Sequence, residues 1–149
     1  MTTVALGDDY WPVLGHGVAA IALYAIVGLA LIVLGFFVLD WTTPGPLRTL
    51  VQARRPNAAA IAASGLVSLS FVVVMAIFTS SGDLLDGLIK TLLFGLLGIV
   101  AQAISVRLIE LVTGIDIGAV LAAERYTPEV LVVVGAHVGM GLITAAAIL

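Results

Sequence analysis

The 149-residue sequence contains no cysteine and few charged residues. The absence of cysteine excludes disulfide bonds, iron–sulfur clusters and thiolate zinc sites, and it leaves the redox compartment undefined. Charged residues make up 10% of the chain, whereas they form roughly a quarter of a typical soluble domain. A net charge of −3, with only six basic residues, provides no concentrated basic face for nucleic acid. A soluble domain and a nucleic-acid-binding protein are therefore both disfavoured.

Long apolar runs dominate the sequence instead. Apolar residues make up 62% of the chain, and the mean hydropathy is +1.25. The core of so short a soluble protein cannot bury that much apolar surface. Lipid can accommodate it, provided that each spanning backbone satisfies its own hydrogen bonds as a helix. The sequence therefore predicts an all-α integral membrane protein that forms a single membrane domain.

Four apolar runs are long enough to cross ~30 Å of hydrocarbon at ~1.5 Å per residue. Residues 1–16 are predicted to form a short acidic tail, with Asp8 and Asp9 followed by Tyr10 and Trp11 at the membrane surface. The first and third connections contain short amphipathic segments, which are predicted to lie as helices in the headgroup region. The predicted spans cover residues 17–39, 58–79, 88–112 and 129–149.

Local signals predict where several helices begin. Thr43 and Pro44 are predicted to be the N-cap and first residue of the first amphipathic helix, and Asn57 is a candidate cap for the second span. Asp83 and Asp86 fall in the first turns before the third span, where carboxylates complement the helix dipole. Asp86 precedes Lys90 by four residues, which favours a helical ion pair.

The basic residues predict the orientation in the membrane. Lys90 alone lies on the side of the second connection. The positive-inside rule then places the first and third connections in the cytoplasm and both termini outside. The basic residues on the predicted cytoplasmic side are Arg48, Arg54, Arg55, Arg107 and Arg125.

Residues 13–79 and 83–149 repeat one order of features at an offset of 70 residues. Each half has a span, an acidic residue, a Thr-containing turn, an amphipathic segment, an Arg, a Pro-containing break and a second span with a central Gly. Because each half has two spans, this order predicts two parallel repeats rather than an inverted pair. The aligned residues include Asp40 with Glu110, Arg55 with Arg125, and Gly65 with Gly135.

The segments DWTTPG (residues 40–45) and RPNAAAIAASG (residues 55–65) resemble the YjfL-like family of small bacterial inner-membrane proteins, known as domain of unknown function 350. The resemblance covers nearly the whole chain, although Thr144 replaces an Asn of the family's last span. It implies four spans and a location in the cytoplasmic membrane. The residues that match the family's motifs are Asp40, Thr43, Pro44, Gly45, Asn57, Ala58, Gly65 and Gly141.

Two groups of polar residues are candidates for a ligand or ion path. Asp40 and Glu110 end equivalent spans, so they form one candidate site for a cation or a polyamine, with Arg107 or Arg55 as counter-charge. The alternative is that they lie at the interface, with Arg107 pairing with Glu110 three residues later. Gln102 and His137 are the deepest polar groups, which suits either a proton or ion path or an interhelical hydrogen bond.

Small and basic residues suggest packing surfaces. Small faces allow helices to approach closely, within one chain or between copies. The basic group of Arg48, Arg54 and Arg55 is suited to bind anionic lipid or an acidic partner. The alternative is that these arginines only set the orientation of the protein in the membrane. A haem held by His16 and His137 is not expected, because the two lie at different depths. The small residues that form such faces are Gly28, Gly35, Ala58, Ala62, Gly65, Gly135 and Gly139.

These patterns favour a non-enzymatic membrane component that forms an oligomer or packs against a membrane-protein partner. No cofactor, metal ion or nucleic acid is expected. The connections are short, and the sequence contains no nucleophile, metal or phosphate-loop motif. The alternative is a small oligomeric channel or transporter for an ion or a small cation such as a polyamine, with Gln102, His137 and the level of Asp40 and Glu110 along its path.

Overall fold

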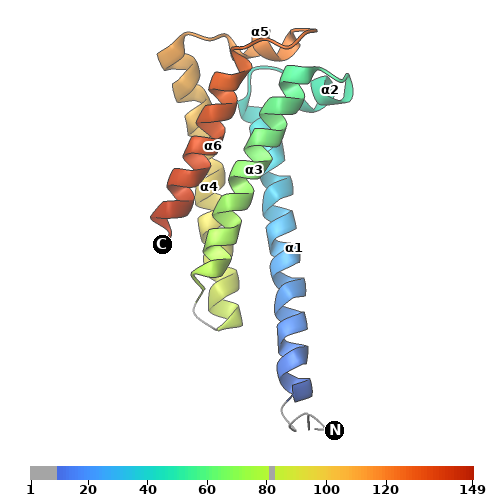
Figure 1. Cartoon of the computed structure of the whole chain (residues 1–149), viewed down its shortest axis with the longest axis vertical. Coiled ribbons are helices and arrows are strands. Elements are labelled where there is room, and N and C mark those ends of the chain that lie inside the picture. The colour runs from blue at the N-terminus through green and yellow to red at the C-terminus, as the bar shows by residue number, and fades with distance from the viewer. Residues whose placement is uncertain (1–9, 81–82) are drawn as a thin grey trace, which may run out of the picture.

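The computed structural model describes residues 10–80 and 83–149, and the regular structure within them is entirely helical (Figure 1). Each of the four long helices has the length and hydropathy needed to cross a membrane. The prediction of an all-helical protein with four helices of spanning length is therefore confirmed. The long helices are α1 (Tyr10–Thr42), α3 (Pro56–Phe78), α4 (Leu84–Thr113) and α6 (Val130–Ala147), and the short ones are α2 (Leu47–Gln52) and α5 (Ile117–Ala122).

Helix α3 lies at the centre of the bundle and contacts every other helix. Its most extensive contacts are with α6, which runs alongside it in the same direction (Figure 1). The short helices α2 and α5 lie together at one end of the bundle, and the end of α3 and the start of α4 lie at the other (Figure 1). The first and third connections thus share one end, as the order of the spans predicts.

The apolar core has two parts. One lies beneath the short helices, where α2 contributes Leu47 and α5 contributes Ile117 and Leu121, all fully buried. The other lies deeper and is built around Leu31 and Leu69. The four long helices also expose large apolar side chains outward, as helices surrounded by lipid rather than water do.

Helix α4 has defined signals at both ends. The side chain of Asp83 accepts hydrogen bonds from the backbone N–H of Leu85 and Asp86, which makes it the N-cap. At the other end Gly114 takes a left-handed conformation with φ 68°, where a glycine costs least, and its N–H bonds to Glu110. The predicted ion pair between Asp86 and Lys90 is confirmed, at 2.6 Å.

The first span is longer than predicted. Residues 10–16 belong to α1 and are not part of the predicted tail. Asp8 and Asp9, the acidic residues of that predicted tail, lie outside the described residues. Tyr24 Oη lies 3.1 Å from Ser80 Oγ, so the middle of α1 is level with the end of α3. Ala20 of α1 lies beside Asp83 and Leu84 at the start of α4, so only the first part of α1 continues beyond the other helices (Figure 1). The start of the first span was predicted from where the apolar run begins. A helix can continue past the membrane surface, so α1 begins earlier than that run.

Two predicted helix starts are wrong. Thr43 does not cap α2, because its N–H and its hydroxyl both donate to Leu39 O and so complete the end of α1. Helix α2 begins at Leu47, with Asp40 Oδ1 accepting from the backbone N–H of Arg48 at 2.8 Å. Asn57 lies inside the first turn of α3, where its side chain makes no capping bond.

Candidate functional site

A buried polar cluster lies between three long helices. Helix α3 contributes Ser64 and Ser68, α4 contributes Gln102, and α6 contributes His137. His137 is fully buried, and Gln102 is 1% exposed. Gln102 and His137 therefore both face the protein interior rather than lipid.

His137 binds α3 through both its ring and its backbone. Its Nδ1 lies 3.0 Å from Ser64 Oγ, and its carbonyl oxygen accepts a 2.6 Å hydrogen bond from the Ser68 hydroxyl. The Ser64 hydroxyl donates its single proton to Ile61 O at 2.9 Å. Ser64 Oγ is therefore left to accept from Nδ1–H of His137, which makes Nε2 of the imidazole an acceptor.

Gln102 links α4 to the same contact. Its amide nitrogen donates to Ser68 Oγ and, at 3.1 Å, to the carbonyl oxygen of His137. Within the described chain, Gln102 Oε1 and His137 Nε2 remain buried without a hydrogen-bond partner. A buried acceptor in this state costs about 1–3 kcal/mol. A proton donor or a cation bound at either atom would recover that cost.

Two glycines allow the close approach of the helices around this cluster. A Cβ at Gly141 would collide with Ser68 Oγ and lie 2.8 Å from Ser68 Cα. A Cβ at Gly65 would lie 2.5 Å from Leu39 Cδ1 and 3.6 Å from His137 Nδ1. Both motif glycines therefore serve helix packing next to the polar cluster.

Ser64 and Ser68 are site residues that the sequence analysis missed. Residues four apart lie on one face of a helix. The pair therefore presents two hydroxyls to α6 from an otherwise apolar span. Two serines at this spacing are the signal that could have identified them.

Asn57 joins the start of α3 to the connection between α5 and α6. Its side-chain nitrogen donates to Val120 O at 2.8 Å, and to Arg125 O and Thr127 Oγ1, each at 3.1 Å. Its Oδ1 accepts from Thr127 N at 3.1 Å. Asn57 is fully buried, so this amide fixes the start of α3 against α5 and the connection that follows it.

The two carboxylates of the predicted pair each have a local partner of their own. Asp40 bonds to the backbone of Arg48, and Glu110 pairs with Arg107 at 3.2 Å, as the alternative interpretation predicts. Arg55 is not their counter-charge, because it pairs with Glu124 at 3.1 Å. These charged side chains are instead used locally, at the end of the bundle that contains α2 and α5.

The two histidines are also far apart in the fold. His16 lies on the exposed early part of α1, where its Nδ1 is 3.2 Å from Pro12 O. His137 is buried against α3. The structure does not bring them together.

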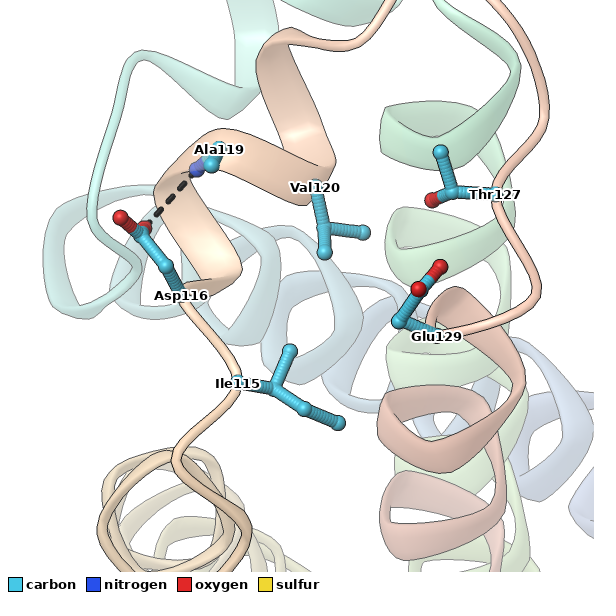
Figure 2. A pocket seen from close by; sticks show the side chains of 6 residues that line it. All are labelled: Ile115, Asp116, Ala119, Val120, Thr127 and Glu129. Atoms are coloured by element: carbon cyan, nitrogen blue, oxygen red, sulfur yellow. Dashed lines mark hydrogen bonds between the residues drawn. The ribbon is translucent and has the colours of Figure 1, made fainter.

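A hollow of about 320 Å³ opens between α5 and the start of α6 (Figure 2). Ile115 and Val120 point toward this space, and Glu129 lines it with its carboxylate directed toward Thr127 (Figure 2). Asp116 lies at the edge of the hollow, and its carboxylate accepts from the Ala119 N–H (Figure 2). The hollow thus combines apolar walls with two exposed carboxylates.

Small residues pack in two different ways. Gly28 faces Val73, and Gly35 faces Leu69, so these glycines pack α1 against α3 inside the chain. Ala58 and Ala62 of α3 are buried as well. By contrast, a Cβ at Gly135 or Gly139 would have no heavy atom of the described chain within 4 Å, apart from its own helix backbone and neighbours. This glycine pair of α6 faces outward.

Four long apolar helices around a buried polar cluster define a multi-pass integral membrane protein. The chain belongs to the family described as Domain of Unknown Function (DUF350), whose model matches residues 13–148. The family resemblance predicted from the sequence is confirmed.

Named relatives agree with this class. A UPF0719 transmembrane protein of Mycobacterium bovis is 47% identical over 81 residues, which are 54% of this chain and 53% of the relative. A UPF0719 transmembrane protein of Mycolicibacterium paratuberculosis is 40% identical over 98 residues, which are 65% of this chain and 64% of the relative. The chain thus spans about half the length of the Mycobacterium bovis relative that it matches. No solved structure matches the chain.

Proposed function

We propose that this protein is a non-enzymatic component of the cytoplasmic membrane whose copies assemble side by side through α6. The observation that supports this function is the outward Gly135 and Gly139 pair, which no other part of the described chain covers. Gly139, Leu142 and Ala146 continue the same helical face at spacings of three and four residues. In lipid, small residues drive helix association because they let two backbones approach closely.

The proposed arrangement is two parallel repeats, with α2 and α5 in the headgroup layer and both termini outside. The bounds of α5, Ile117–Ala122, each fall 70 residues after those of α2, Leu47–Gln52. The hydrogen bonds between Asn57 and Thr127 join residues at the same separation. Basic residues gather at the end that holds α2 and α5, which supports a cytoplasmic location for that end.

The assembly is tested by substituting the outward glycine. Gly135→Leu should leave the fold of one copy intact, because the added side chain points into open space. It should shift the protein in lipid nanodiscs or mild detergent from oligomer toward monomer, by about tenfold or more in dissociation constant. Light scattering or native mass spectrometry measures the shift. Ala30→Leu, another outward small-to-large change, is the matched control on α1.

Two results would contradict this function. A wild-type protein that is monomeric in nanodiscs at every protein concentration would exclude assembly of copies. An oligomer that Gly135→Leu and Gly139→Leu leave unchanged would exclude α6 as its contact.

A second candidate function is an ion or small-cation path through the assembled protein. The two buried acceptors without partners, Gln102 Oε1 and His137 Nε2, favour it. Polar groups at this depth, facing a protein interior, are typical of ion and proton pathways. The cation class includes polyamines, whose ammonium groups donate the hydrogen bonds that both atoms lack.

Liposomes containing the purified protein distinguish the two functions. A path predicts proton, potassium or spermidine flux that Gln102→Leu and His137→Ala each abolish. An assembly without a path predicts no flux above that of empty liposomes. Self-association should persist in both variants, because neither residue lies on the outward face of α6.

A further inference from the structure

The two connections that share one end of the bundle have opposite charge. Residues 41–57, which include α2, contain Arg48, Arg54 and Arg55 and no acidic residue. Residues 114–129, which include α5, contain three acidic residues and Arg125. Opposite charges at one level of the same molecule can also meet between neighbouring copies in a membrane, because copies in one membrane share orientation and depth.

One such contact already exists inside the chain. Arg55 of the first connection pairs with Glu124 of the second at 3.1 Å. This pair leaves Arg48 and Arg54 as the remaining basic side chains of the first connection, and both residues are exposed. Neither of these side chains has an ion pair among the described residues.

The hollow between α5 and α6 has the shape and charge to receive one of these arginines. Its volume is about 320 Å³, and Glu129 lines it, with its carboxylate directed toward Thr127 and without an ion pair in the described chain (Figure 2). Ile115 and Val120 provide apolar walls for the methylene stem of an arginine, and Glu129 provides a carboxylate for its guanidinium. Asp116, at the edge, adds a second negative charge.

We propose that the hollow between α5 and α6 is the docking site for Arg54 of a second copy of this chain. The proposal rests on the assembly of copies proposed above, and it adds a polar contact at the surface to the glycine contact within the lipid. Arg54, in the turn that follows α2, inserts beside Glu129 and Asp116, and Arg48 lies nearby on α2 itself. The occupant is a second copy because the first connection supplies the complementary charge at the depth of the hollow (Figure 1).

Charge reversal with rescue tests this contact. In nanodiscs, Arg54→Glu and Glu129→Arg should each weaken self-association by about tenfold or more, since close charge pairs at interfaces couple strongly. The double variant Arg54→Glu with Glu129→Arg restores the pair with opposite polarity, so it should return to within about threefold of the wild type. Gln52→Glu, which adds a negative charge to α2 at a neighbouring position, should not be rescued by Glu129→Arg.

Salt and lipid composition provide a second measurement. Raising salt to about 1 M should weaken assembly of the wild type and leave Arg54→Gln unaffected, because salt screens the pair. The effect of Arg54→Glu should be the same in neutral and in anionic nanodiscs. An effect that appears only with anionic lipid, or a double variant that fails to recover, would mean that Arg54 binds headgroups and would overturn the docking site.

The failure of this contact is distinguishable from the failure of the assembly. If Gly135→Leu dissociates the oligomer while both charge reversals leave its dissociation constant unchanged, α6 is the interface and the hollow is not part of it. If the wild type is monomeric, the assembly itself is absent and the docking site is overturned with it.

Discussion

Asn57 connects residues that lie far apart in the sequence. Its amide provides hydrogen bonds to two carbonyl groups and to Thr127, and all of these partners lie 63 to 70 residues later in the chain. A buried amide with this many partners is a specific link, because no other side chain matches its donors and acceptor at the same size. The connection between α5 and α6 is therefore held in place by the start of α3.

Replacement of this amide should destabilise the fold. Asn57→Ala leaves the buried carbonyl of Val120 and the N–H of Thr127 without their partner. We expect the free energy of unfolding to fall by about 2 kcal/mol or more, since each unsatisfied buried group costs about 1–3 kcal/mol. Unfolding by denaturing detergent, followed by circular dichroism, measures the loss. Gln52→Ala, a change at an exposed position of α2, is the control, and equal stabilities of the two variants would contradict the role of Asn57.

The sequence predicted the ion pairs within single helices correctly, because both partners lie within about one turn of each other. The i,i+4 pair of Asp86 with Lys90 and the i,i+3 pair of Arg107 with Glu110 are both present. For Asn57 the sequence predicts a helix cap, which is the local use of an Asn near a helix start, whereas its hydrogen-bond partners belong to α5 and the connection that follows it. Spacing along the chain cannot identify a partner that only the fold brings near.

At the scale of helices, glycines divide α6 into two faces. Gly141 lies against Ser68 of α3, and Gly135 and Gly139 lie on the outward face. The small residues of α6 predict that another helix packs closely against it. Their spacing does not predict which of them face α3 and which face away from the bundle. Only the position of α3 separates the contact within the chain from the uncovered face.

Matched alanine substitutions should separate these two faces. In Gly141→Ala the new Cβ would lie 2.8 Å from both Ser68 Cα and Ser68 O, and the backbone cannot move away as a flexible side chain can. We expect a loss of about 1–3 kcal/mol in the free energy of unfolding, as in other overpacked interiors. In the dissociated single chain, Gly139→Ala adds the same atom in open space and should be neutral or slightly stabilising, because alanine favours helix. The same unfolding titration compares them, and a Gly141→Ala variant as stable as Gly139→Ala would refute the close contact.

At the scale of the whole molecule, the depth of the bundle matches a membrane. Residues 24–42 of α1 and the 18 residues of α6 each span about 28 Å, close to the ~30 Å of a hydrocarbon core. Composition predicted four spans because a lipid solvent requires long apolar helices. It did not predict that the first part of α1 continues beyond the other helices, since an apolar sequence does not show where its neighbouring helices end.

The topology can be tested with single cysteines, because the natural chain has none and each introduced thiol is unique. Thr49→Cys on α2 and Ala122→Cys on α5 should react from the cytoplasmic side, and Leu85→Cys at the start of α4 from the other side; all three positions are exposed. The reason is that α2 and α5 lie at the end where arginines gather, and basic connections stay in the cytoplasm. Labelling intact spheroplasts with a membrane-impermeant maleimide, before and after permeabilisation, measures the side. Protection of Thr49→Cys and Ala122→Cys until permeabilisation, with immediate labelling of Leu85→Cys, is the expected result. The reverse pattern would mean that the protein has the opposite orientation in the membrane. Labelling of Thr49→Cys and Ala122→Cys from opposite sides would exclude the arrangement of four spans.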